Sequence, residues 1–88
     1  MKTVFRKSFA RDLKRIKDQD LLKRVEQVIA EVEAAAHLQE IGNLKKMGGT
    51  TNFYRIRIGE YRIGVAVEED TVDFVRCLAR RDLYRFIP

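Results

Sequence analysis

With 88 residues, of which 45% are hydrophobic, the chain is expected to form a single domain over residues 1–88 and not to be intrinsically disordered. The single cysteine and single histidine give no reason to expect a disulfide, a metal or another cofactor. Basic residues close to the N-terminus and the lack of any ~20-residue apolar window favour a cytoplasmic protein over a secreted or membrane-bound one, and the net charge of +5 favours an anionic partner.

The N-terminal half is predicted to be mainly helical after a short edge strand at residues 3–5. Ser8 is expected to cap a first helix and Asp20 a second, with a break at residues 18–20. Apolar residues recur at helical spacing in both, namely Phe9, Leu13 and Ile16 in the first helix and Leu21, Leu22, Val25, Val28, Ile29, Val32, Ala35 and Ala36 in the second. The two helices are predicted to form an antiparallel pair, and residues 42–43 end the helical region.

Residues 54–65 carry the most regular pattern, because apolar and polar residues alternate on both sides of Gly59 and Glu60. Such alternation predicts two antiparallel strands joined by a tight turn. One face of this hairpin is then entirely apolar, and the other carries Arg55, Arg57 and Arg62. Arg57 and Arg62 lie opposite each other, and this pairing of like charges lowers the stability of the hairpin by up to ~1 kcal/mol. Because positive charge is concentrated on this face despite the loss of stability, the pattern indicates an anionic ligand.

A further strand is predicted at residues 72–78, and its apolar character on both faces near its end indicates a central position in the sheet. The pattern leaves its register open. Cys77 is interpreted as a small buried side chain, and Arg76 as a structural residue paired with the acidic turn or with a helix carboxylate. Two helices followed by an antiparallel meander predict an α+β domain, with an N-terminal antiparallel helix pair packed on a small, mainly antiparallel, twisted β-sheet.

Basic residues of the C-terminal half gather on the hairpin and near the end of the chain. They are Lys45, Lys46, Arg55, Arg57, Arg62, Arg76, Arg80, Arg81 and Arg85. Arginine dominates this set, and its planar guanidinium suits bidentate contacts with phosphate and stacking on bases. The set therefore predicts nucleic acid as the partner rather than a membrane. The alternative is a solvated basic surface with no ligand, and Lys45 and Lys46 fit a solvated loop as well as an RNA contact.

Four short motifs follow the helical region in a fixed order. They are Lys-Met-Gly-Gly at 46–49, Tyr-Arg-Ile-Arg at 54–57, Gly-Glu-Tyr-Arg-Ile at 59–63 and Arg-Arg-Asp-Leu-Tyr at 80–84. Together with the helix pair, they make residues 2–86 closely resemble the RelE/ParE superfamily of type II toxins. The resemblance implies a small sheet wrapped by N-terminal helices, and a cognate antitoxin encoded beside the toxin. It further implies either RelE-like cleavage of mRNA in the ribosomal A site, which we expect, or the alternative, ParE-like inhibition of DNA gyrase without catalysis.

The resemblance also implies roles for individual residues. As candidate catalytic residues it indicates Arg57, Arg62, Arg80, Arg81 and Tyr84, and as candidate RNA contacts we add Lys45, Lys46 and Arg55. Arg62 matches the arginine that clamps the scissile phosphate, and Tyr84 the tyrosine that stacks on or orients the nucleotide. Either Arg80 or Arg81 matches the C-terminal catalytic arginine, with the spacing to the tyrosine favouring Arg80.

The implied chemistry is attack of a ribose 2′-hydroxyl on its own 3′-phosphate, a reaction that needs no external nucleophile and no metal. Preorganised cations stabilise the negative charge that develops on the phosphoryl oxygens. Where the best-known family member has lysines, this chain has Arg55 and Arg57, and arginine effectively never loses its proton. Tyr84 is the one candidate general base, since nearby arginines would stabilise its phenolate. His37 is interpreted as a surface or helix-end residue, and mRNA and ribosomal RNA are the expected nucleic-acid partners.

Overall fold

Five strands form one sheet in the order β1-β5-β4-β3-β2 in the computed structural model, which describes residues 1–86. The elements in chain order are β1 (Lys2–Phe5), α1 (Lys7–Arg15), α2 (Gln19–Ala34), a short 3-10 helix η1 (Leu38–Glu40), β2 (Leu44–Lys46), β3 (Phe53–Ile58), β4 (Tyr61–Glu68), β5 (Thr71–Ala79) and α3 (Arg80–Phe86). Only the β1–β5 pair is parallel among the described strands. The predicted α+β class with a mainly antiparallel sheet is confirmed.

The β3–β4 hairpin has the register that the alternation predicts. Arg57 pairs with Arg62, and the pairs on either side of it also match the expected ones. Gly59 has a φ of 55°, in the left-handed region that glycine adopts without steric cost. β5 is an interior strand of the sheet, as predicted, and lies between β1 and β4. Its register, which the sequence left open, shifts at Gly64 and Val65 of β4.

The predicted starts of both N-terminal helices are wrong. α1 begins at Lys7, and Ser8 lies inside it, where its hydroxyl donates to the carbonyl oxygen of Val75 at 2.6 Å. The N-cap of α2 is Asp18 rather than Asp20, because the Asp18 carboxylate accepts from the backbone N–H groups at positions 20 and 21. α2 ends at Ala34, so the predicted helix residues Ala35 and Ala36 lie outside it, but η1 ends at Glu40, close to the predicted end of the helical region at residues 42–43.

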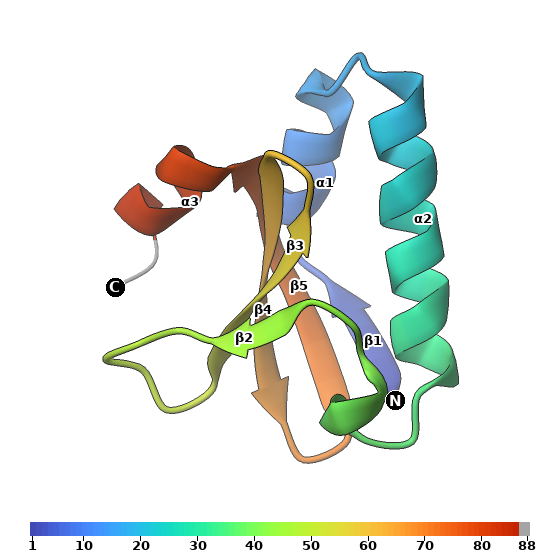
Figure 1. The fold of residues 1–88 in the computed structure, drawn as a ribbon, viewed down its shortest axis with the longest axis vertical. Coiled ribbons are helices and arrows are strands. Elements are labelled where there is room, and N and C mark those ends of the chain that lie inside the picture. Colours follow the sequence, from blue (N-terminus) through green and yellow to red (C-terminus); the bar gives the residue numbers. More distant parts are fainter. Residues whose placement is uncertain (87–88) are drawn as a thin grey trace.

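The two N-terminal helices run in opposite directions on one face of the sheet (Figure 1). α1 packs on β5, whereas α2 reaches β1 and β3. The main core lies between these helices and the sheet, and its fully buried side chains include Phe9, Val25, Ile56, Ile63 and Phe74. The predicted helix pair is therefore confirmed in direction, but each helix packs on its own part of the sheet.

α1 also continues the hydrogen bonding of β5 beyond the point where β1 ends. Asp12 accepts from the Cys77 backbone N–H at 2.9 Å and from the Arg76 guanidinium at 2.8 and 3.0 Å. Asp12 is only 4% exposed, so a buried carboxylate here is matched by three donors. This contact confirms that Arg76 is structural and is paired with a helix carboxylate.

The opposite face of the sheet carries α3 and a second, smaller core. Met47 and Leu83 are buried there, and Phe53 and Leu78 pack against them. Neither α3 nor β2 follows from the sequence pattern, which left residues 45–46 in a loop and the C-terminal segment without assigned structure. Among residues 1–86, no helix is long and apolar enough to cross a membrane.

Candidate functional site

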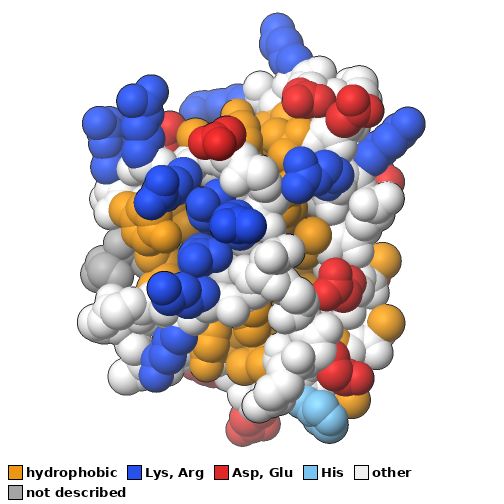
Figure 2. Space-filling model, in the orientation of Figure 1, with side chains coloured by type: hydrophobic (Ala, Val, Ile, Leu, Met, Phe, Trp, Pro, Cys, Tyr) orange, Lys and Arg blue, Asp and Glu red, His pale blue; other side chains and the backbone are white. Residues whose placement is uncertain are grey.

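Strand alternation places the hairpin arginines on the face of the sheet that α1 and α2 do not cover. β2 adds Lys45 to this face, directly opposite Arg55 in the neighbouring strand. Lys46 pairs instead with Tyr54, whose side chain packs into the main core on the helix side. Figure 2 shows Lys and Arg side chains gathered over α3 and the neighbouring strands. Of the two lysines predicted to contact RNA, the structure therefore brings only Lys45 to the arginine face.

Arg62 is the most constrained of these side chains, with an exposure of 7%. Its Nη1 atom donates to the carbonyl oxygens of Gly59 at 2.7 Å and Tyr61 at 2.9 Å. The Nε atom is buried and has no hydrogen-bond partner among the described residues. The turn therefore holds one edge of the guanidinium in place. The unpaired N–H at Nε lowers the stability of the fold, because a buried donor of a charged group has lost its contact with water.

Four charged or titratable side chains act on Arg62 from two other elements, β3 and α3. Burial is the main cause that lowers the pKa of Arg62, and the positive charges of Arg55, Arg80 and Arg57 lower it further. Tyr84 acts in the opposite direction and raises the pKa. The side chain of Tyr84 is 49% exposed, so it is open to a ligand. The fold thus brings four of the predicted site residues around the buried guanidinium of a fifth, Arg62.

An open pocket of about 390 Å³ lies at the tip of the β3–β4 hairpin. Its lining residues are Arg24, Asn43, Arg57, Gly59, Glu60, Arg62 and Arg80. Arg81 lines a neighbouring pocket of about 400 Å³, together with Glu60, Ala79 and Arg80. Arg80 is therefore the C-terminal arginine that shares a pocket with Arg57 and Arg62, whereas Arg81 lies beside it.

Four residues of this pocket were not predicted as site residues from the sequence: Arg24, Asn43, Gly59 and Glu60. Arg24 lies on α2 next to the buried Val25 and three positions after the buried Leu21, so helical spacing places it at the border of the apolar stripe. Asn43 has a φ of 60°, and such backbone strain in a non-glycine residue is common at functional sites. Only the position of Arg24 beside the stripe was visible as a signal in the sequence.

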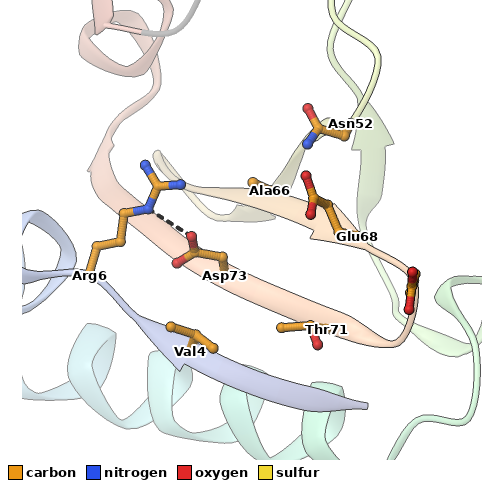
Figure 3. Close-up of a pocket in the computed structure, with 8 residues that line it drawn as sticks. Val4, Arg6, Asn52, Ala66, Glu68, Thr71 and Asp73 are labelled. Atoms are coloured by element: carbon orange, nitrogen blue, oxygen red, sulfur yellow. Dashed lines mark hydrogen bonds and ion pairs between the residues drawn. The ribbon is translucent and has the colours of Figure 1, made fainter.

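A third pocket, of about 460 Å³, occupies the other half of the same sheet face (Figure 3). It is lined by Val4, Arg6, Asn52, Ala66, Glu68, Glu69, Thr71 and Asp73. Its basic residue, Arg6, is already paired with Asp73, with Nε and Oδ2 2.7 Å apart. The excess of carboxylates repels a phosphate. An anionic ligand is therefore expected at the arginine pocket, and not here.

The remaining candidates lie apart from the arginine pocket. Cys77 is buried as predicted, and burial, with a smaller contribution from the Asp12 charge, raises its pKa to about 12. Such a thiol is not a nucleophile at neutral pH. His37 is exposed and precedes η1. Residues 1–86 contain no group of three or more His, Cys, Asp and Glu side chains that could hold a metal ion.

Comparison with known proteins is consistent with this geometry. Residues 3–84 match the family described as ParE toxin of type II toxin-antitoxin system, parDE. Toxin RelE3 of Methanocaldococcus jannaschii is 39% identical over 89 residues, covering 100% of both chains. A chain of the RelB-RelE antitoxin-toxin complex from Methanococcus jannaschii matches with a TM-score of 0.82 and 38% identity over 97% of this chain and 99% of that one. The YoeB dimer of Staphylococcus aureus, at 19% identity, covers 91% of this chain and 97% of that one with a TM-score of 0.73, and shows the fold alone.

Proposed function

The chain belongs to the ParE toxin family of type II toxin–antitoxin systems, on the RelE-like branch of the RelE/ParE superfamily, and from this premise we propose that it is an endoribonuclease that cleaves mRNA in the ribosomal A site. One observation carries the proposal. Arg62 is buried with an unpaired Nε, and the charges of other arginines act on it. An RNA phosphate would offset this repulsion between the arginines. The buried, unpaired guanidinium by itself adds little to the stability of the fold.

In the proposed reaction, the ribose 2′-oxygen forms a bond to the adjacent phosphorus while the bond from phosphorus to the 5′-oxygen breaks. The products are a 2′,3′-cyclic phosphate and a 5′-hydroxyl. Arg62 and Arg80 are assigned to the scissile phosphate, where they stabilise the charge that develops on its oxygens. Tyr84 is assigned as the general base that takes the 2′-proton, and water supplies the proton that the 5′-oxygen gains.

Mapping of mRNA 5′ ends after induced expression tests this function. The expected result is new 5′ ends within translated frames, which disappear when translation is blocked. Tyr84→Phe should lower cleavage by about 10²–10⁴-fold, as expected when a general base is removed, without loss of folding, because the side chain is 49% exposed. Intact mRNA together with halted DNA replication would instead support the gyrase inhibitor.

We also propose a cognate antitoxin and ribosomal RNA as partners of this chain. Relatives occur in complexes described as RelB-RelE, YoeB-YefM and DinJ-YafQ. On this chain, α3 and the uncompensated arginines offer a surface to an acidic amphipathic segment. Co-expression of the small gene next to the toxin gene should abolish mRNA cleavage. Unchanged cleavage in the presence of that product would contradict the assignment of the antitoxin.

A further inference from the structure

The proposed reaction leaves two arginines of the hairpin-tip pocket, Arg24 and Arg57, without a role. The pocket takes one arginine from each of four elements, namely Arg24 from α2, Arg57 from β3, Arg62 from β4 and Arg80 from α3. The scissile phosphate occupies Arg62 and Arg80 in the reaction above. Arg24 comes from a helix that otherwise packs on the sheet through its apolar stripe.

Arg24 and Arg62 both reach Gly59 in the turn. A Cβ atom built on Gly59 would lie 3.3 Å from Nη1 of Arg24, while the carbonyl oxygen of Gly59 accepts from Nη1 of Arg62 at 2.7 Å. The arginines whose charges chiefly lower the pKa of Arg62 are Arg55, Arg80 and Arg57. Arg24 thus brings a further guanidinium to the same turn, from α2 instead of from β3 or α3.

The helices that carry Arg24 and Arg80 pack on different strands. α2 contacts β3, the strand that carries Arg57, and Arg57 is exposed near the end of β3. α3 contacts β4 and β5, and the Arg80 backbone N–H donates to the Glu60 carbonyl oxygen at 2.8 Å. Arg80 thus approaches from the side of β4, where Arg62 lies. Figure 1 shows the hairpin tip between α3 and the two N-terminal helices.

The charge of the pocket exceeds what one phosphodiester neutralises. Its four guanidinium groups face a single carboxylate, that of Glu60. Within residues 1–86, the side chains of Arg24, Arg57 and Arg80 make no hydrogen bond or ion pair with other side chains. Unpaired guanidinium groups in a shared pocket raise the local concentration of polyanions. Each of them can donate two parallel hydrogen bonds to a phosphate.

We propose that Arg24 and Arg57 form a second phosphate subsite beside the one at Arg62 and Arg80, so that the pocket holds two consecutive phosphates of a single RNA strand. This inference rests on the proposed function, because it takes the ligand to be RNA. Arg24 would then be a binding residue that fixes the strand on one side of the cleaved nucleotide. Holding both phosphates orients the reacting ribose between them.

Calorimetric titration with two small probes tests the subsite directly. Adenosine 3′,5′-bisphosphate presents two consecutive phosphates, and adenosine 3′-monophosphate presents one. The wild-type protein should bind the bisphosphate about tenfold more tightly, as expected for one additional charge-assisted contact. Arg24→Gln should abolish this advantage and leave the affinity for the monophosphate unchanged.

Lys23→Gln is the matched control, because Lys23 precedes Arg24 on α2, is exposed, and does not line the pocket. It removes the same charge and should keep the bisphosphate advantage. With single-stranded RNA, Arg24→Gln should also make the slope of log K against log salt less steep by about 0.7, which corresponds to one lost phosphate contact. Circular dichroism checks that each variant is folded.

Three results would overturn the subsite: no bisphosphate advantage in the wild type, an advantage that survives in Arg24→Gln, or an equal loss in Lys23→Gln. The last would mean that only net charge matters. The subsite and the proposed function fail separately. Intact mRNA combined with the expected titration pattern would refute the nuclease alone, whereas translated-frame cleavage combined with any of the three results would refute the subsite alone.

Discussion

Replacing Arg62 by methionine should strongly reduce RNA cleavage and leave the melting temperature nearly unchanged. Methionine keeps an unbranched stem in the buried position but removes the guanidinium. The change removes two hydrogen bonds to the carbonyls of Gly59 and Tyr61, each worth about 1.5–3 kcal/mol for a charged donor. It also removes a buried charge with an unpaired Nε, whose desolvation costs several kcal/mol, and up to ~1 kcal/mol of repulsion from the opposed Arg57.

These contributions nearly cancel, and the exposed Gly59 allows water to satisfy its carbonyl oxygen. We therefore expect the melting temperature to change by less than about 8 °C, the shift that ~1 kcal/mol causes in a domain of this size. Cleavage should fall by about 10²–10³-fold, because one preorganised donor to the transition state is lost. Thermal melting by circular dichroism and primer extension on ribosome-bound mRNA measure the two quantities.

Arg76→Met is the matched control, since it removes another partly buried arginine of the sheet. Its guanidinium is paired with Asp12, with Nε and Oδ2 2.8 Å apart. Breaking such a pair costs about 3–5 kcal/mol, so the melting temperature should fall by more than ~12 °C, while the folded fraction cleaves RNA normally. The reasoning would be refuted if Arg62→Met cleaved at the wild-type rate, or if it melted as low as Arg76→Met.

Three further predictions concern other parts of the chain. Asp18→Ala should lower the free energy of unfolding by ~1 kcal/mol because it removes the α2 cap, whereas Asp20→Ala should lower it by at most about half as much. Urea denaturation measures both losses, and equal losses would contradict the capping geometry. Lys45→Gln should weaken binding of single-stranded RNA and reduce its salt slope by about 0.7, whereas Lys46→Gln, on the opposite face, should change neither in the same titration. Burial raises the pKa of Cys77 to about 12, so the unfolded chain loses the thiol proton at a lower pH than the folded chain. The free energy of unfolding should therefore fall as the pH rises from about 9 to about 12, and this fall should be smaller in Cys77→Ala.

The amino-acid sequence by itself determined the parts of this protein that depend on neighbouring residues. The β3–β4 register follows from strict alternation around Gly59, because a shift by one residue would expose the whole apolar face. The same alternation places Arg55, Arg57 and Arg62 on one face, and the run of apolar residues in β5 predicts its central position. Family membership was also visible, because the motifs lie in the hairpin and at the C-terminus.

Only the tertiary structure decided features whose partners are distant in the chain. α3 has seven residues, too few to form a stable helix alone, and it is held by packing of Leu83 against Met47. β2 is a strand because it pairs with β3, and Arg76 finds Asp12 at a separation of 64 residues. Arg62 is buried, and Arg24 lies at the hairpin tip, because α3 and α2 pack on the sheet. Local periodicity determines which face a side chain occupies, but long-range packing determines which other residues it meets there.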